Sequence, residues 1–316
     1  MAMKVMMIGF SGSGKTSYMG GMYSMLNQES CVGFSLRAKD EKAHENFLRI
    51  GANLAKGIYP KGTDILEEYK FSLLHNGERI LDFDWHDYRG GVLNMSDGPE
   101  FDRVINMIVE SDALVVFLDL PMFSSERDRK TIGVMNRIMS LIQNVTSKVQ
   151  SDVNFPISFV LTKLDSISEG ITETLGWQRF LRVKELIAES KNICGLSTAT
   201  VVGMQGCLDL QYPFLFTMYA AMRKKADEMI EEHNRKISEA NVHANNGGFF
   251  DDLVTGIGNF FTGKANLSNN DIAQREIRDA NNMRERIMAF LNGPLEKVNE
   301  YMCSEARKDD TLLDLF

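Results

Sequence analysis

Near the start of the chain stands the stretch that decides the fold, Val5-Met6-Met7-Ile8-Gly9-Phe10-Ser11-Gly12-Ser13-Gly14-Lys15-Thr16. Its first four residues are apolar and predict a buried strand, and its last eight match GxxxxGK[ST] between that strand and a helix. Glycines at these positions let successive backbone N–H groups curl around phosphates, beside the positive end of the following helix. The stretch therefore predicts a phosphate-binding loop (P-loop) and not an ordinary glycine-rich turn.

Two side chains of this loop have chemistry of their own. Lys15 places a positive charge on the β- and γ-phosphates of a nucleotide, and the Thr16 hydroxyl is a ligand for Mg²⁺. The residues expected to contact the phosphates and the metal are Gly9, Ser11, Gly12, Ser13, Gly14, Lys15, Thr16 and Ser17. The predicted ligand is a nucleotide with bound Mg²⁺.

Outward from the P-loop, short apolar runs alternate with longer segments of helical period, which predicts an α/β fold with a mostly parallel sheet flanked by helices. The expected strands are Lys4–Ile8, Val32–Arg37, Glu68–Leu74, Arg79–Asp84, Ala113–Leu120, Pro156–Leu161 and Thr198–Gly203. The expected helices are 15–28, 39–56, 98–110, 124–150, 174–191 and 209–243. Asn76-Gly77 separates the third and fourth strands and predicts an antiparallel hairpin there.

A carboxylate for the metal is expected just after the fourth strand. Asp87-Tyr88-Arg89-Gly90 fits the pattern DxxG, in which Asp87 reaches Mg²⁺ through water and the Gly90 N–H senses the γ-phosphate. This four-residue pattern has weight only because it lies two strands after the P-loop. Asp84 is the rival metal carboxylate, ranked second because it lies nearer the interior of the strand.

A switch threonine that meets the metal in the triphosphate state is expected one hairpin upstream of DxxG. Thr63 occupies that place, and residues 57–62 before it have the composition of a mobile loop. The alternative interpretation of Thr63, an ordinary loop threonine, stays open.

Base recognition is expected from Thr162-Lys163-Leu164-Asp165, which follows the buried strand Pro156–Leu161 and fits [NT]KxD. An Asp165 carboxylate would accept from N1 and the exocyclic amine of guanine, a pair of donors that adenine lacks, while the Lys163 stem covers the base. A site built on such a pair rejects the wrong base because its own polar group would stay unpaired. The motif therefore predicts guanine.

A last element of the base site is expected after the final strand, where a backbone N–H meets the guanine oxygen. Val202-Gly203-Met204-Gln205-Gly206 occupies that place and resembles an SAxxG loop in which Gly203 replaces serine. Gly203 and Met204 are the candidate contacts.

Taken in this order, the motifs resemble a Ras-like P-loop GTPase core of the translation-factor-related (TRAFAC) class over roughly residues 1 to 215. Tyr59-Pro60, the tract 85–91, and an extra strand and helix at about 32–56 are similar to the bacterial double-GTPase-like proteins, a group implied to act as regulatory or conflict-system GTPases. One P-loop is present, so the resemblance implies a single GTPase unit of such a system.

One residue departs from the Ras-like pattern. The position directly after DxxG is often a glutamine that orients the attacking water, and here it is Gly91, which has no side chain. The hypothesis is that intrinsic hydrolysis is slow, or that a partner or second subunit completes the site, as an arginine finger does. Arg89 is the nearby residue that would act within the same chain.

Beyond the nucleotide domain, predicted over residues 1–208, the remaining segment 209–316 is expected to form a helical hairpin. An apolar cluster at 249–261 connects its long helices. It is either an interaction tip for a partner or membrane surface, or a loop folded back onto the helices, and the second alternative is favoured. The C-terminal run Leu312–Phe316 is either a peptide motif or a docked end.

Bulk properties exclude several classes of function. The chain has 316 residues and a formal net charge of −8, which argues against nucleic-acid binding as its main role. Its four cysteines have no metal-binding spacing and are interpreted as buried or idle thiols of a reducing compartment. Without a secretory signal or an apolar run long enough to span a membrane, the protein is expected in the cytoplasm.

Two functions remain from different classes. The leading one is a GTPase that hydrolyses GTP to GDP with Mg²⁺ and acts as a regulatory switch for a partner protein or second GTPase subunit. The alternative is a scaffold that binds GTP or GDP stably and hydrolyses little. Gly91 favours the scaffold, and the complete phosphate and metal set favours the switch.

Overall fold

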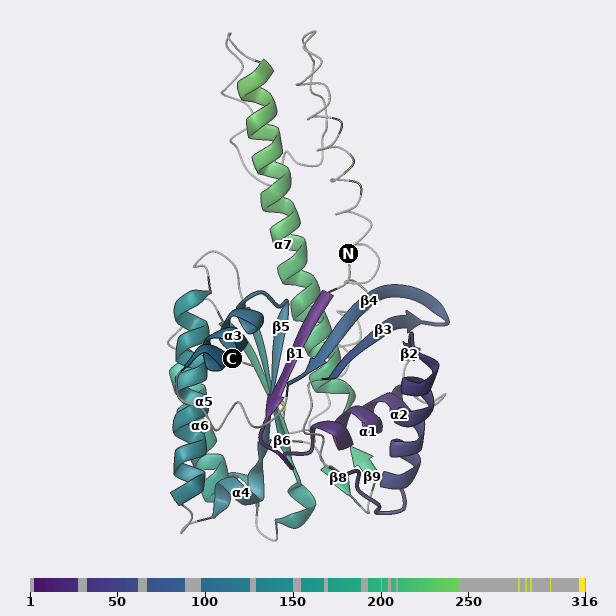
Figure 1. Cartoon of the computed structure of the whole chain (residues 1–316), viewed down its shortest axis with the longest axis vertical. Helices are drawn as coiled ribbons and strands as arrows, with labels where there is room; N and C mark the ends of the chain where they lie inside the picture. Colours follow the sequence, from purple (N-terminus) through teal and green to yellow (C-terminus); the bar gives the residue numbers. More distant parts are fainter. Residues whose placement is uncertain are drawn as a thin grey trace. The chain divides into compact units, whose positions relative to one another are not determined.

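Apolar runs of the sequence assemble into one mixed sheet, with eight strands among the described residues in the order β10-β7-β6-β5-β1-β4-β3-β2 (Figure 1). These strands are β1 (Met3–Gly9), β2 (Phe34–Ala38), β3 (Glu67–His75), β4 (Glu78–Asp87), β5 (Ala113–Asp119), β6 (Phe155–Thr162), β7 (Ile193–Ala199) and β10 (Leu313–Leu315). Strands β4, β1, β5, β6 and β7 pair in parallel, and the outer pairings are antiparallel. The predicted α/β fold with a mostly parallel sheet is confirmed.

The computed structural model describes most of the chain up to residue 244 and a few positions beyond it. The described residues are 3–27, 33–61, 67–88, 98–125, 129–149, 155–167, 170–188, 193–199, 201–203, 206–208, 210–244, 278, 282, 285, 296 and 313–315.

Helices cover both faces of the sheet, as Figure 1 shows. They are α1 (Lys15–Leu26), α2 (Glu41–Leu54), α3 (Pro99–Val109), α4 (Leu120–Ser124), α5 (Arg129–Lys148), α6 (Leu175–Ala188) and α7 (Gln211–Ala244). The buried side chains of α3, α5 and α6 form one apolar cluster with alternate residues of β1, β5 and β6. On the opposite face Tyr18 of α1 meets Phe117 at 5.1 Å, and Phe214 of α7 stacks on Trp85 at 5.8 Å between ring centroids.

The β3–β4 hairpin forms as predicted and brings Asp87 to the sheet edge where β1 ends. Both turn residues have positive φ, 51° at Asn76 and 82° at Gly77, the conformation that a two-residue hairpin turn requires. Because β4 is parallel to β1 and pairs Asp87 with Met7, the last residue of β4 lies near the start of the P-loop.

The extra strand and helix expected at about 32–56 are β2 and α2. Strand β2 pairs antiparallel with β3 at the edge of the sheet, and α2 packs against α1. A Cβ on Gly20 would lie 2.2 Å from the Ile50 side chain, so the absence of a side chain there allows the close approach of the two helices. Tyr23 joins them through a 2.6 Å contact between its hydroxyl and Nδ1 of His44.

One predicted strand is corrected, and an alternative that the sequence left open is decided. The strand expected at Thr198–Gly203 is β7 at Ile193–Ala199; Val201–Gly203 forms β8, which pairs with β9 (Gly206–Leu208) in a separate hairpin. Small residues such as Gly195 and Ser197 hid the apolar character of β7. The helix expected over 124–150 is α5, and the short helix α4, which precedes it, was not expected. The C-terminal run is a docked end, because β10 pairs antiparallel with β7.

The chain divides into two compact units, one comprising residues 1–224 with 294–316 and the other comprising 225–293. In the second unit the described part of α7 carries ion pairs one turn apart, such as Glu232 with Arg235 and Lys236. The apolar cluster 249–261 lies outside the described residues, and so does almost all of the chain after it, where the second helix of the predicted hairpin was expected. No helix in the described part of the chain is both long and apolar enough to cross a membrane.

Candidate functional site

The P-loop connects the end of β1 to the start of α1 through a tight turn. Its backbone has positive φ at Gly12 (80°) and Gly14 (92°), a region that residues with a side chain rarely adopt. A hydrogen bond of 3.0 Å from the Ser13 N–H to the Phe10 carbonyl closes the turn. Gly14 stands at the N-terminus of α1, so the partial positive charge of that helix end faces the loop. The loop therefore has the backbone of an anion cradle.

Lys15, the first residue of α1, turns its ammonium back toward the loop. Its Nζ donates to the Gly9 carbonyl at 2.9 Å and lies 3.9 Å from Oδ1 of Asp87. Burial lowers the pKa of Lys15, and the neighbouring Asp87 carboxylate opposes that shift. A buried ammonium with one distant counter-charge is well placed to attract an anion.

Asp87, the last residue of β4, is a buried carboxyl group with unused hydrogen-bonding capacity. Burial raises its pKa to about 6, with Lys15 opposing the shift and Glu67 adding to it. Its Oδ1 is buried and has no hydrogen-bond partner in the part of the chain that the structure describes. A buried carboxylate oxygen left in this way fits a cation or its water shell.

A Mg²⁺ ion is compatible with these residues. Its preferred ligands are oxygens, and it keeps several waters and substrate phosphates in its shell. Thr16 lines the pocket and has a hydroxyl group that can bind the ion, and Asp87 provides a carboxylate. No group of three His, Cys, Asp or Glu side chains that would hold a metal occurs among the described residues, so phosphate and water would have to complete the shell.

Asp84, the rival carboxylate, lies elsewhere along β4. It pairs with Lys4 at the beginning of β1, whereas Asp87 pairs with Met7 near its end. Three residues of strand separate the two aspartates by about 10 Å along the chain. The geometry therefore favours Asp87 as the carboxylate beside the P-loop.

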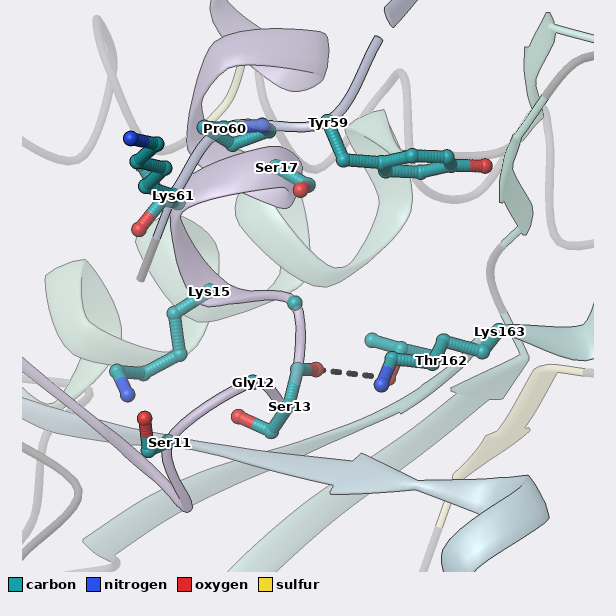
Figure 2. A pocket seen from close by; sticks show the side chains of 12 residues that line it. Ser11, Gly12, Ser13, Lys15, Ser17, Tyr59, Pro60, Lys61, Thr162 and Lys163 are labelled. Carbon is teal, nitrogen blue, oxygen red and sulfur yellow. Dashed lines mark hydrogen bonds between the residues drawn. The ribbon is translucent and has the colours of Figure 1, made fainter. Parts of the chain in front are cut away.

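A pocket of about 240 Å³ opens over the P-loop and is bordered on its other side by a segment that follows α2. Its lining residues are Ser11, Gly12, Ser13, Gly14, Lys15, Thr16, Ser17, Tyr59, Pro60, Lys61, Thr162 and Lys163. Figure 2 shows Tyr59, Pro60 and Lys61 across the pocket from Ser11, Gly12 and Ser13. The sequence interpretation of residues 57–62 as a mobile loop missed this lining role, for which the pattern Tyr-Pro just before Thr63 was the available signal.

Thr162, at the end of β6, fastens the base-recognition motif to the P-loop. Its hydroxyl lies 2.8 Å from the Ser13 carbonyl and 3.2 Å from the Leu118 carbonyl, so it donates to backbone on either side (Figure 2). Since Thr162 is buried, this link holds the two motifs at one wall of the pocket.

Lys163 follows with its backbone in the left-handed region (φ 62°) and its ammonium paired with the carboxylate of Asp119 at the end of β5. Sequence reasoning did not single out Asp119. The available signal was an aspartate at the carboxyl end of the buried strand next to β6, where parallel strands present functional side chains.

Asp165 lies in a 3-10 turn, Leu164–Ser166, directly after Lys163, and is exposed. It does not line the pocket over the P-loop, which comprises the phosphate end of the candidate site. Strand β8, which ends at Gly203, lies against this turn. The structure thus brings the two predicted base-recognition segments together, with Thr162 and Lys163 in the lining of the pocket and Asp165 outside it.

Four predicted site residues lie outside the described residues: Thr63, Arg89, Gly90 and Met204. Their assigned roles stay predictions.

Comparison with known proteins gives one family. The family model described as Double-GTPase 2 matches residues 4–192, more than half of the chain. No protein among those with curated functions matches the chain.

Solved structures give distant likenesses. The nucleolar GTP-binding protein 1 of Plasmodium falciparum is 12% identical with a TM-score of 0.43, over 75% of this chain and 96% of that one. The small GTPase Arl6 of Trypanosoma brucei, with the bound analogue GppNp, is 16% identical with a TM-score of 0.38, over 71% and 99%. A GDP-bound NFeoB variant of S. thermophilus is 13% identical with a TM-score of 0.35, over 96% and 99%.

Proposed function

The chain belongs to the Double-GTPase 2 family of GTP-binding P-loop proteins, and on that premise we propose that it binds GTP and GDP with Mg²⁺ and hydrolyses GTP as a regulatory switch for a partner protein. The partner is a protein or a second GTPase subunit, and the site of action is the cytoplasm.

The observation that carries this proposal is the buried Lys15–Asp87 pair at the end of the P-loop. The ammonium faces the cradle, and the carboxylate keeps one oxygen without a hydrogen-bond partner among the described residues. A triphosphate with its metal would satisfy both groups, because its oxygens accept from Lys15 and the water shell of the metal donates to Asp87.

The metal would be held by the Thr16 hydroxyl, by Asp87 through water, and by the Thr63 hydroxyl in the triphosphate state. When bound it supplies positive charge that offsets the charge developing on the transferred phosphoryl group. The chain itself contributes Lys15 beside the β- and γ-phosphates and the Gly90 N–H as the sensor of the γ-phosphate. Loss of that phosphate would release the segments around Thr63 and Gly90, which is the switching output.

Guanine selection would rest on Asp165, which accepts from the two donors of the base, and on the Lys163 stem, which covers the ring. A backbone N–H at Gly203 or Met204 would meet the guanine oxygen. This part of the proposal is supported by the contact between β8 and the turn Leu164–Ser166.

Hydrolysis by the isolated chain is proposed to be slow. Gly91 offers no side chain to orient the attacking water, so a partner, or Arg89 of the same chain, would have to complete the site. The same observation favours the second candidate function, a scaffold that binds GTP or GDP stably and hydrolyses little.

Single-turnover hydrolysis of GTP by the purified full chain with Mg²⁺ separates the two functions. The switch predicts slow but measurable cleavage that is lost in Lys15→Ala and is accelerated by a partner. Binding of GTP without any cleavage over several hours would favour the scaffold, and binding of neither GTP nor GDP would overturn both.

A further inference from the structure

The Lys163 ammonium is paired with Asp119, a residue that belongs neither to the P-loop nor to the base-recognition motif 162–165. We propose that Asp119 is a positioning residue for the guanine site, which orients the Lys163 side chain as one wall of that site. This inference rests on the proposed function and deepens it, because it adds a residue to the base end.

Asp119 is fixed by both of its carboxylate oxygens. Oδ1 accepts from the Met122 N–H at 3.1 Å and so caps the N-terminus of α4, while Oδ2 accepts from Nζ of Lys163 at 2.5 Å. The side chain is mostly buried, with 15% of its surface exposed. A carboxylate held in this way has one orientation, so it presents a fixed anchor to the ammonium.

The backbone around the pair is fixed as well. Asp119 pairs with Thr162 in the parallel β5–β6 register, one residue before Lys163. Lys163 starts from a left-handed backbone conformation, and the Thr162 hydroxyl ties the preceding residue to the P-loop. Both ends of the lysine side chain, its Cα and its ammonium, are therefore anchored to elements that also build the phosphate pocket.

An anchored lysine has a consequence for binding. A lysine side chain has many rotamers, and ordering it when a ligand arrives costs free energy. With its ammonium already on Asp119, the Lys163 side chain, which lines the pocket, is ordered before a base arrives (Figure 2). Asp119 thus acts on the base through Lys163 and has no contact with the phosphates.

The alternative is that the Asp119–Lys163 contact is an ordinary surface ion pair, which contributes little to stability or to binding. Asp119→Asn separates the two, because asparagine still caps a helix but has no charge to hold the ammonium. The matched control is Asp40→Asn: Asp40 caps α2 through the Ala43 N–H at 2.9 Å and does not line the pocket. Lys163→Met retains an apolar stem and removes the ammonium.

The test is calorimetric binding of GDP, ADP and inorganic tripolyphosphate to the full chain, with thermal unfolding of each variant. We expect Asp119→Asn to weaken GDP binding roughly three- to tenfold, with unchanged tripolyphosphate affinity and an unfolding temperature close to that of Asp40→Asn. In the Lys163→Met background, Asp119→Asn should have no further effect, because the two residues act as one unit.

The outcomes distinguish this inference from the proposed function. A parent protein that binds GDP better than ADP, combined with an Asp119→Asn variant equal to it, overturns the inference alone. Equal losses of GDP and tripolyphosphate binding also overturn it, because the variant would then act through the phosphate end. A parent protein without any preference for guanine overturns the proposed function and removes the base site that Asp119 would serve.

Discussion

The two ends of the candidate site are built in different ways. The proposed phosphate end depends largely on one continuous segment, the P-loop and the first turn of α1, of which residues 11–17 line the pocket. The proposed base end would be assembled from three segments far apart in the chain: the end of β5, the tract 162–165 that begins at the last residue of β6, and β8. A local cradle needs only its own residues, whereas an assembled site needs the sheet to be in place first.

This difference predicts that variants of the two ends have different signatures. Phosphate-end variants should lower the affinity for every nucleoside triphosphate by the same factor. Base-end variants should change the ratio between nucleotides and leave phosphate binding intact. The ratio of GTP to inosine triphosphate affinity is a suitable measure, because inosine lacks the exocyclic amine of guanine.

The largest effect is expected from Lys15→Met, which removes the buried ammonium but retains most of the apolar stem. Loss of a buried charged partner costs about 2–5 kcal/mol, so GTP affinity should fall by about two orders of magnitude. The affinity for inosine triphosphate should fall by the same factor, measured by calorimetry with Mg²⁺. A fall confined to GTP would contradict the division between the two ends.

An intermediate effect is expected from Asp87→Asn on the stability of the nucleotide-free protein. The folded state raises the pKa of Asp87 from 3.8 to about 6, so folding favours the protonated carboxyl group. Its contribution to stability is fully present below about pH 4 and is lost as the pH rises through about 6. Relative to the parent, Asp87→Asn should therefore gain up to about 2–3 kcal/mol between pH 4 and pH 7.

Denaturant unfolding of both proteins at several pH values, without nucleotide or metal, measures this gain. A stability difference that does not change with pH would show that Asp87 is not an unsatisfied buried carboxyl group.

The smallest effect is expected from Asp84→Asn. Asp84 pairs with Lys4 at the far end of β1 from the P-loop, so it should not touch the metal. The Mg²⁺ dependence of GTP binding should stay within about twofold of the parent, the range in which substitutions away from a site usually fall. If Asp84→Asn weakened Mg²⁺-dependent GTP binding as much as Asp87→Asn does in the same titration, Asp87 could not be assigned as the metal carboxylate in preference to Asp84.

The sequence signals for the phosphate end are local. The P-loop pattern, the turn Asn76-Gly77 and the position of Asp87 at the end of β4 each depend on a few neighbouring residues or on a turn of fixed geometry. Asp87 rather than Asp84 lies beside Lys15 because of the register between β1 and β4, and this register cannot be derived from the sequence alone.

Contacts between distant segments were harder to predict. The Asp119–Lys163 pair depends on the parallel register of β5 and β6, and strand β10 has only three residues, too few for a periodic signal. The start of β7 was missed because small residues replace its apolar pattern. The family model matches residues 4–192, a range that contains both the P-loop and the tract 162–165. The match is therefore consistent with the GTPase family that the local motifs predicted.

The proposed guanine specificity of this P-loop protein can be tested by one titration. GTP, GDP and ATP are titrated with Mg²⁺ into the parent and into Asp165→Ala, with Glu185→Ala, an exposed carboxylate of α6, as the control for loss of charge. We expect binding of GTP and GDP but not of ATP, a loss of affinity of at least tenfold in Asp165→Ala, and no change in Glu185→Ala. Equal affinity for ATP, or indifference to the loss of Asp165, would contradict the base-recognition claim and leave a P-loop protein without guanine specificity.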